Sequence, residues 1–183
     1  MRQFFAIFAV VIFSAMGSAC AQEDNFTPAP VNRLAHFDAL VGTWEGVTTD
    51  PEGTGGDVMR FEWILGGAAV QHTHALADGT YGGRTIYFFD PTLNEGSGNI
   101  IYHYFTTAGF HTQGTAWWEG DTLHANEAVV GHPTITEVDA IITFNGDGSL
   151  TSQSRYLDNG EWTQGHGFHY VRTEGAEMVF PDE

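Results

Sequence analysis

Lysine is absent from the sequence and cysteine occurs once, and both shortages exclude classes of function. Without lysine, the chain cannot form the Schiff base that many enzymes make with a carbonyl compound. Six arginines stand against 23 acidic residues, which leaves a formal net charge of −17 at pH 7. Nucleic acids and anionic membrane surfaces are therefore excluded as partners, because both are bound through basic patches. We interpret the acidity as a source of solubility in a salty or exposed medium, the alternative being a role in cation binding.

The one cysteine lies in an N-terminal segment, residues 1–21, that has the features of a signal peptide. Arg2 precedes an apolar run over residues 4–13, which is too short to span a bilayer. Ala19-Cys20-Ala21 fits the small-x-small rule of signal peptidase and predicts cleavage before Gln22. The sequence thus predicts a periplasmic or secreted protein whose mature chain has no cysteine, and hence no disulfide or thiolate chemistry.

Cys20 leaves a second interpretation open, in which a lipid on this residue anchors the protein. Lipid-attachment motifs usually have leucine or a similar residue three positions before the cysteine, whereas this chain has Gly17 there. We therefore favour a cleaved signal peptide over a lipid anchor.

The rest of the chain is long enough for one domain with a substantial core. Residues 22–32 contain two prolines and predict an extended lead-in. Residues 33–40 place Leu34, Phe37 and Leu40 at helical spacing and predict a short helix. We expect one β domain over residues 33–174, followed by an acidic C-terminal tail over residues 175–183.

From residue 41 onward, glycine beside asparagine or aspartate marks a series of tight turns, such as Asp78-Gly79 and Asn159-Gly160. Between the turns the sequence predicts about ten strands, near residues 41–49, 57–65, 68–77, 82–90, 98–107, 109–118, 121–130, 134–144, 149–157 and 161–172. Even spacing indicates an up-and-down meander, and closure would remove its unpaired edges. The expected fold is all-β: a single antiparallel up-and-down β-barrel with a short N-terminal helix.

The segment Leu40-Val41-Gly42-Thr43-Trp44, after the predicted helix, resembles the Gly-x-Trp opening of lipocalin-like barrels, the calycin group. In that group the tryptophan closes the barrel end against a basic residue of the last strand. The resemblance therefore assigns barrel closure to Gly42, Trp44 and Arg172. Residues 61–67 and 87–91 look like motifs of a family of exported bacterial lipocalin-like proteins. This family is described only as a domain of unknown function. A barrel of the lipocalin, fatty-acid-binding or nitrobindin kind is implied, with a central cavity for a small, mostly apolar molecule.

Nine histidines are the unusual feature of the composition. His72 and His74 lie on one face of a predicted strand, about 7 Å apart at the backbone. Such a pair would share a zinc ion with a third histidine, for which the candidates are His124, His103 and His166. Two alternatives stay open. The pair lines the cavity, hydrogen-bonded to tyrosines or backbone, or it contacts a haem by analogy with nitrobindin-like barrels. The sequence requires no cofactor.

Our leading hypothesis is a binding protein whose cavity holds a small apolar or amphipathic ligand. The orienting polar groups would be His72, His74, Tyr102, His124 and His166. His166 belongs to this set because strand alternation puts it on one face with Trp162, Gln164, Phe168 and Tyr170. Arg155 is expected to face solvent, the alternative being a position opposite a ligand carboxylate.

An enzyme is the alternative function. A histidine in the cavity would act as acid or base, or a histidine-bound metal would activate water. Familiar nucleophile, phosphate-binding and dinucleotide-binding motifs are absent. A third hypothesis, an interaction module that forms a homodimer, depends on two strands, near residues 86–89 and at Trp117-Trp118, that are apolar on both faces. These strands predict that the helix or a second subunit covers part of the outer wall.

Overall fold

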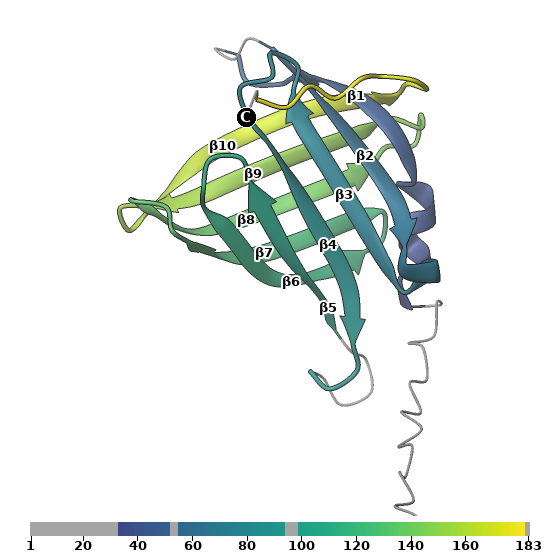
Figure 1. Ribbon diagram of the computed structural model, residues 1–183, viewed down its shortest axis with the longest axis horizontal. Helices are drawn as coiled ribbons and strands as arrows, with labels where there is room; N and C mark the ends of the chain where they lie inside the picture. The colour runs from purple at the N-terminus through teal and green to yellow at the C-terminus, as the bar shows by residue number, and fades with distance from the viewer. Residues whose placement is uncertain (1–32, 52–54, 94–98, 182–183) are drawn as a thin grey trace, which may run out of the picture.

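The computed structural model describes residues 33–51, 55–93 and 99–181. The predicted signal peptide, Cys20 and the lead-in over residues 22–32 lie outside the described residues. Ten antiparallel strands form a closed barrel (Figure 1), which confirms the predicted all-β, up-and-down fold. The strands are β1 (Gly42–Thr48), β2 (Gly56–Ile64), β3 (Ala69–Leu76), β4 (Gly82–Asp90), β5 (Asn99–Thr106), β6 (His111–Glu119), β7 (Thr122–Val130), β8 (Ile135–Phe144), β9 (Leu150–Asp158) and β10 (Glu161–Arg172).

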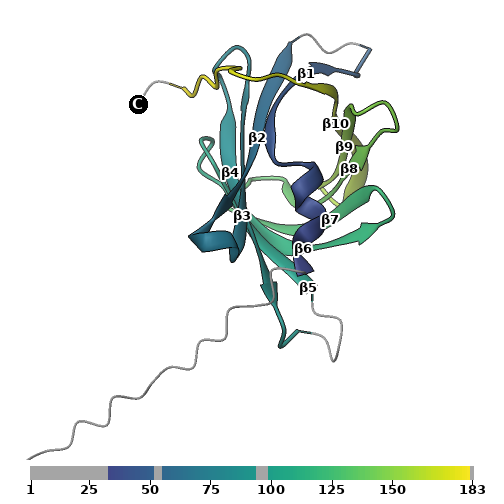
Figure 2. The ribbon, with the colours of Figure 1, turned by 90° about the vertical axis from the view of Figure 1, so that its right-hand side faces the viewer.

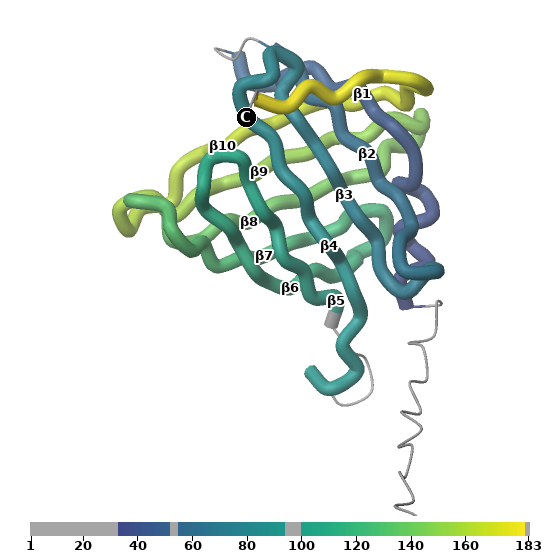
Figure 3. The backbone as a smooth tube through the Cα atoms, viewed as in Figure 1, coloured from purple at the N-terminus to yellow at the C-terminus, as the bar shows by residue number. Residues whose placement is uncertain are grey.

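Each strand pairs with the next one along the chain, and β1 pairs with β10 to close the barrel. The tube in Figure 3 follows this meander from the purple N-terminal strand to the yellow C-terminal one. The strand bounds lie within two residues of those predicted. The turn between β9 and β10 shows why turn residues were informative. Asn159 and Gly160 have positive φ angles of 49° and 84°, as a tight hairpin requires.

Side chains alternate between the inside and the outside of the barrel, as β2 illustrates. Asp57, Met59 and Phe61 are buried, and the first two line the central cavity. Arg60 and Glu62 lie outside, in a groove that the C-terminal segment shares with β2, β3 and β4. The segment after β10, yellow in Figure 1, thus contributes Gly175, Ala176, Glu177, Met178 and Phe180 to this groove on the outer wall.

The short helix η2 (Ala35–Ala39), a 3-10 helix, lies across one end of the barrel, where it is purple in Figure 2. Phe37 is fully buried, and its ring centroid lies 5.0 Å from that of Tyr87 and 5.6 Å from that of Trp118. The helix therefore covers one end of the barrel. The expectation that it covers part of the outer wall is wrong. A second 3-10 turn, η3 (Leu65–Gly67), joins β2 to β3. No helix in the described ranges is long and apolar enough to cross a membrane.

The structure brings Gly42, Trp44 and Arg172 together at the end that η2 covers. Trp44 is fully buried and donates its indole N–H to the Leu40 carbonyl at 2.8 Å. The Arg172 guanidinium lies over this indole ring, 4.2 Å from its centroid, and donates to the backbone carbonyls of Val41 and Ala39. Gly42 has a φ of 134°, and a Cβ there would collide with the guanidinium. One arginine thus joins the last strand to the helix and the first strand.

Replacing Arg172 with alanine is expected to lower the free energy of unfolding by about 1–2 kcal/mol. Both the cation–π contact and two charge-assisted hydrogen bonds would be lost. Arg155→Ala is a matched control, because Arg155 also lies over a tryptophan ring, that of Trp162, but on the open surface. There we expect a loss below about 1 kcal/mol. Equal losses in urea unfolding of the two variants would show that Arg172 has no special role in barrel closure.

Candidate ligand-binding site

The barrel encloses a cavity of about 490 Å³ whose walls are mainly apolar. Tyr81, Phe110 and His132, from the connections after β3, β5 and β7, line its outer part. These connections lie at the end opposite η2, so the cavity opens at that end. Its volume lies within the range of roughly 300–1,000 Å³ that is usual for pockets that hold small molecules.

Small side chains on neighbouring strands leave the space that forms the cavity. Ala116, Ala125, Ala140 and Ser154 are consecutive cross-strand partners from β6 to β9. The last three line the cavity directly. Larger residues in this row would fill the barrel, as side chains do in most small barrels. This row of small residues therefore leaves an open cavity inside the barrel.

All six tyrosines of the chain line this cavity: Tyr81, Tyr87, Tyr102, Tyr104, Tyr156 and Tyr170. Burial raises the pKa of Tyr81 to about 12, and it also raises the pKa of Tyr87, Tyr102, Tyr104 and Tyr170. These phenols are thus neutral at physiological pH. They offer a ligand both aromatic faces and hydroxyl groups.

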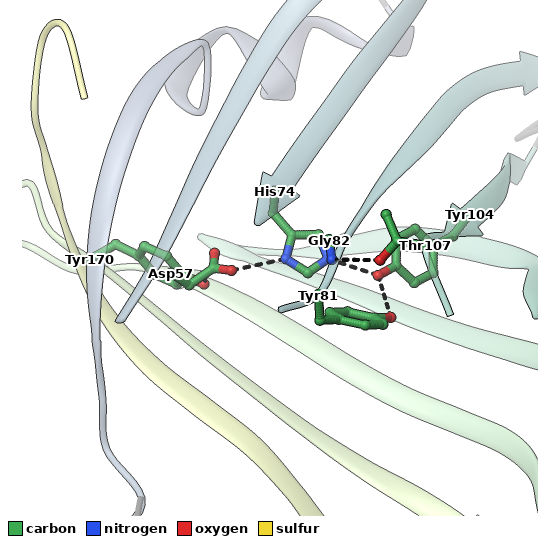
Figure 4. Close-up of polar contacts among 7 residues, drawn as sticks. All are labelled: Asp57, His74, Tyr81, Gly82, Tyr104, Thr107 and Tyr170. Carbon is green, nitrogen blue, oxygen red and sulfur yellow. Dashed lines mark hydrogen bonds and ion pairs between the residues drawn. The ribbon is translucent and has the colours of Figure 1, made fainter. Parts of the chain in front are cut away.

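Five polar residues near the open end form one hydrogen-bonded chain, which Figure 4 shows and which we call the His74 chain. In order it contains Tyr81, Tyr104, His74, Asp57 and Tyr170. The Tyr81 and Tyr104 oxygens are 2.6 Å apart, and the Tyr104 oxygen is 2.8 Å from His74 Nε2. His74 Nδ1 lies 2.9 Å from the buried Asp57 carboxylate, to which Tyr170 donates at 2.9 Å.

One proton arrangement satisfies the whole His74 chain. Asp57 accepts from Nδ1–H of His74 and from Tyr170, and Nε2 of His74 then serves as the acceptor for Tyr104. Tyr104 in turn accepts from Tyr81. The Tyr81 oxygen keeps its acceptor capacity at the open end of the cavity. Both ring nitrogens of His74 are therefore occupied within the protein.

His72 lies two residues deeper on β3, and its imidazole stacks on Phe61 with a centroid distance of 4.3 Å and an interplanar angle of 4°. Burial, and the nearby His74, lower the pKa of His72 well below its usual value, so this ring is neutral. Its Nε2 and the Tyr102 hydroxyl are buried without a regular hydrogen-bond partner. Each buried polar atom without a hydrogen-bond partner lowers the stability of the folded state by about 1–3 kcal/mol. Such atoms are rare in walls that serve packing alone.

Glu127 on β7 is a cavity residue that sequence reasoning missed. Thr112 donates to its carboxylate, and the Tyr102 hydroxyl lies close enough to influence it. Burial raises the pKa of Glu127 to about 7, against the opposing effect of these hydroxyls. A signal was available in the sequence, because strict alternation along β7 puts Glu127 on the face of Leu123, Ala125 and Val129, all of which line the cavity.

The structure places three of the predicted ligand-binding residues in the cavity wall, namely His72, His74 and Tyr102. His166 also lines the cavity, but it is exposed and contacts the Tyr156 and Phe168 rings near the open end. A bulge between Gln164 and Gly167 interrupts the alternation of β10. It leaves Trp162 outside, where the sequence predicted an inner position.

His124 lies on the outer face, and its prediction as a ligand-binding or metal-binding residue is corrected. Leu123 and Ala125 on either side of it point inward, so its ring points outward and stacks on Trp117 at 5.2 Å. His103 is likewise outside, stacked between Phe88 and Phe105.

The predicted zinc site of His72, His74 and His124 is therefore not assembled. The residues do not fit a zinc ion, because both ring nitrogens of His74 are hydrogen-bonded and His124 lies on the outer face. Across the described ranges, no group of three or more histidine, aspartate or glutamate side chains is arranged to bind a metal.

Comparison with protein-family models and with curated protein sequences finds no match for this chain.

Proposed function

We propose that this protein is an exported barrel that binds a small apolar or amphipathic molecule in its central cavity. The observation that carries the proposal is a cavity of about 490 Å³ whose aromatic and aliphatic wall contains polar atoms without a partner. An apolar pocket with a few convergent polar groups is the usual form of a small-molecule site. The resemblance to lipocalin-like barrels supports the same function.

The His74 chain supports binding over catalysis. A histidine that acts as general base needs a ring nitrogen within reach of the substrate proton. Here one nitrogen faces Asp57 and the other faces Tyr104. The chain instead fixes the Tyr81 hydroxyl at the open end, where it can orient a ligand.

Export is proposed from residues 1–21, in which an arginine, an apolar run and a small-x-small tripeptide follow in order. The strong negative charge suits a protein that must stay soluble.

Native mass spectrometry of the protein purified without added ligand or chelator tests the binding function. We expect a 1:1 organic adduct that Ala125→Trp removes, because the indole would fill the space left by the row of small residues. Ala128→Trp is the matched control, since Ala128 is exposed on the outside of the same strand. An adduct that survives Ala125→Trp, or disappears equally in both variants, would place the ligand outside the cavity.

A further inference from the structure

Building on the proposed binding function, we propose that the ligand is an organic cation: an amine with an apolar body whose ammonium group pairs with the Glu127 carboxylate. The proposal follows from the charges that line the cavity, from the surroundings of Glu127, and from the aromatic walls.

No permanent positive charge lines the cavity. The chain has no lysine, and none of its five described arginines is among the lining residues. Arg60 and Arg84 lie in the outer groove, and Arg155 pairs with Asp139 on the outer face. Arg172 binds backbone carbonyls at the closed end, and Arg33 lies over Phe89. A ligand carboxylate would therefore meet no cation, unlike a fatty acid in barrels that hold it with arginine.

Two carboxyl groups line the cavity, and they differ in their partners. Asp57 is already bound by His74 and Tyr170. Glu127 accepts a hydrogen bond from Thr112 and interacts with the Tyr102 hydroxyl, and within the described part of the chain no arginine or histidine forms an ion pair with it. Of the two carboxyl groups in the cavity, Glu127 is thus the one without a positively charged partner among the described residues.

The surroundings of Glu127 are arranged for a guest next to it. Gly114 is its cross-strand neighbour on β6, and any side chain at Gly114 would collide with the Asn126 carbonyl. The position therefore adds no bulk beside the carboxyl group. Tyr102, 3% exposed, lines the same part of the wall, and its hydroxyl lacks a regular partner. Tyr87, in ring contact with Tyr102, adds a second aromatic face.

Physical chemistry favours an ammonium group here over a neutral head group. A carboxylate among apolar walls is poorly solvated, which is why the pKa of Glu127 is raised to about 7. An ammonium ion beside this carboxylate would offset its desolvation by forming an ion pair. The faces of the tyrosine rings would add cation–π attraction. The same carboxylate would repel an anionic guest.

The test compares three probes of equal chain length, decylammonium, decanol and decanoate, by isothermal titration calorimetry at pH 8. Glu127 is ionised at that pH and the amine is still protonated. We expect the wild-type protein to bind decylammonium at least about ten-fold more tightly than decanol, and decanoate most weakly. In Glu127→Gln the preference for decylammonium over decanol should vanish.

Glu137→Gln is the matched control, because Glu137 is exposed on the neighbouring strand β8 and does not line the cavity. This variant should keep the wild-type order of affinities. Decanol or decanoate binding as tightly as decylammonium would overturn the cation proposal and leave the binding function intact. Failure of all three probes, together with no organic adduct in native mass spectrometry, would overturn both.

Discussion

Glu127→Gln is expected to raise the free energy of unfolding at pH 8 by up to about 3 kcal/mol. The Glu127 pKa is raised from 4.5 to about 7 by burial in the native protein, and each unit corresponds to about 1.4 kcal/mol. Between these two pH values the native state binds more protons at this site than the unfolded state does. Wild-type stability therefore falls as pH rises through this window, and the loss is complete above it. Glutamine removes the loss.

The measurement is urea unfolding of the wild type and the variant at intervals from pH 4 to pH 9. The difference between the two should be small at pH 4, grow between about pH 4.5 and 7, and then stay constant. Glu137→Gln should show no such growth, because Glu137 is exposed. A constant difference across the whole pH range would mean that Glu127 is not desolvated as described. A bound ligand with a positive charge would reduce the free energy of unfolding that the wild type loses when Glu127 ionises.

Asp57→Ala is expected to destabilise the protein by about 3–5 kcal/mol. Asp57 is fully enclosed at the centre of the His74 chain, and its removal leaves Nδ1–H of His74 and the Tyr170 hydroxyl without acceptors. Removing one partner from a buried polar network costs more than the hydrogen bonds themselves contribute, because the remaining groups stay desolvated. The loss should appear as a lower urea midpoint with an unchanged slope.

Tyr170→Phe provides the comparison, because it removes one hydroxyl and leaves no buried donor unpaired. We expect a loss of about 1–2 kcal/mol for this variant. The double variant should lose clearly less than the two single losses together, since both changes break the same hydrogen bond. Additive losses, or an Asp57→Ala loss below about 1 kcal/mol, would show that the His74 chain is not a coupled network.

The fold could be predicted from the sequence because its signals are local. Turns such as Asn159-Gly160 fix where strands end, and alternation as in β2 fixes which side chains point inward. The closure residues Trp44 and Arg172 could be named only through a resemblance, since nothing local in the sequence links them.

The site was predictable only where a single strand determines it. His72 and His74 follow the alternation of β3 and lie inside as expected. The partners that complete the His74 chain come from three other strands and one connection, and no local pattern pairs them. The bulge in β10 turned Trp162 outward, which alternation cannot foresee. His124 and Glu127 are different, because the apolar neighbours of each on β7 already indicate the correct face.

The pairing of β1 with β10 has a consequence for the order of folding. Trp44 and Arg172 are cross-strand partners more than a hundred residues apart in the sequence. The ring of hydrogen bonds therefore cannot close until the final strand has been synthesised, and closure requires the costly meeting of distant chain segments. A nascent chain that lacks β10 has open edges on β1 and β9 and exposes its cavity wall. Complete closure of the barrel is therefore among the last steps by which this chain reaches its folded state.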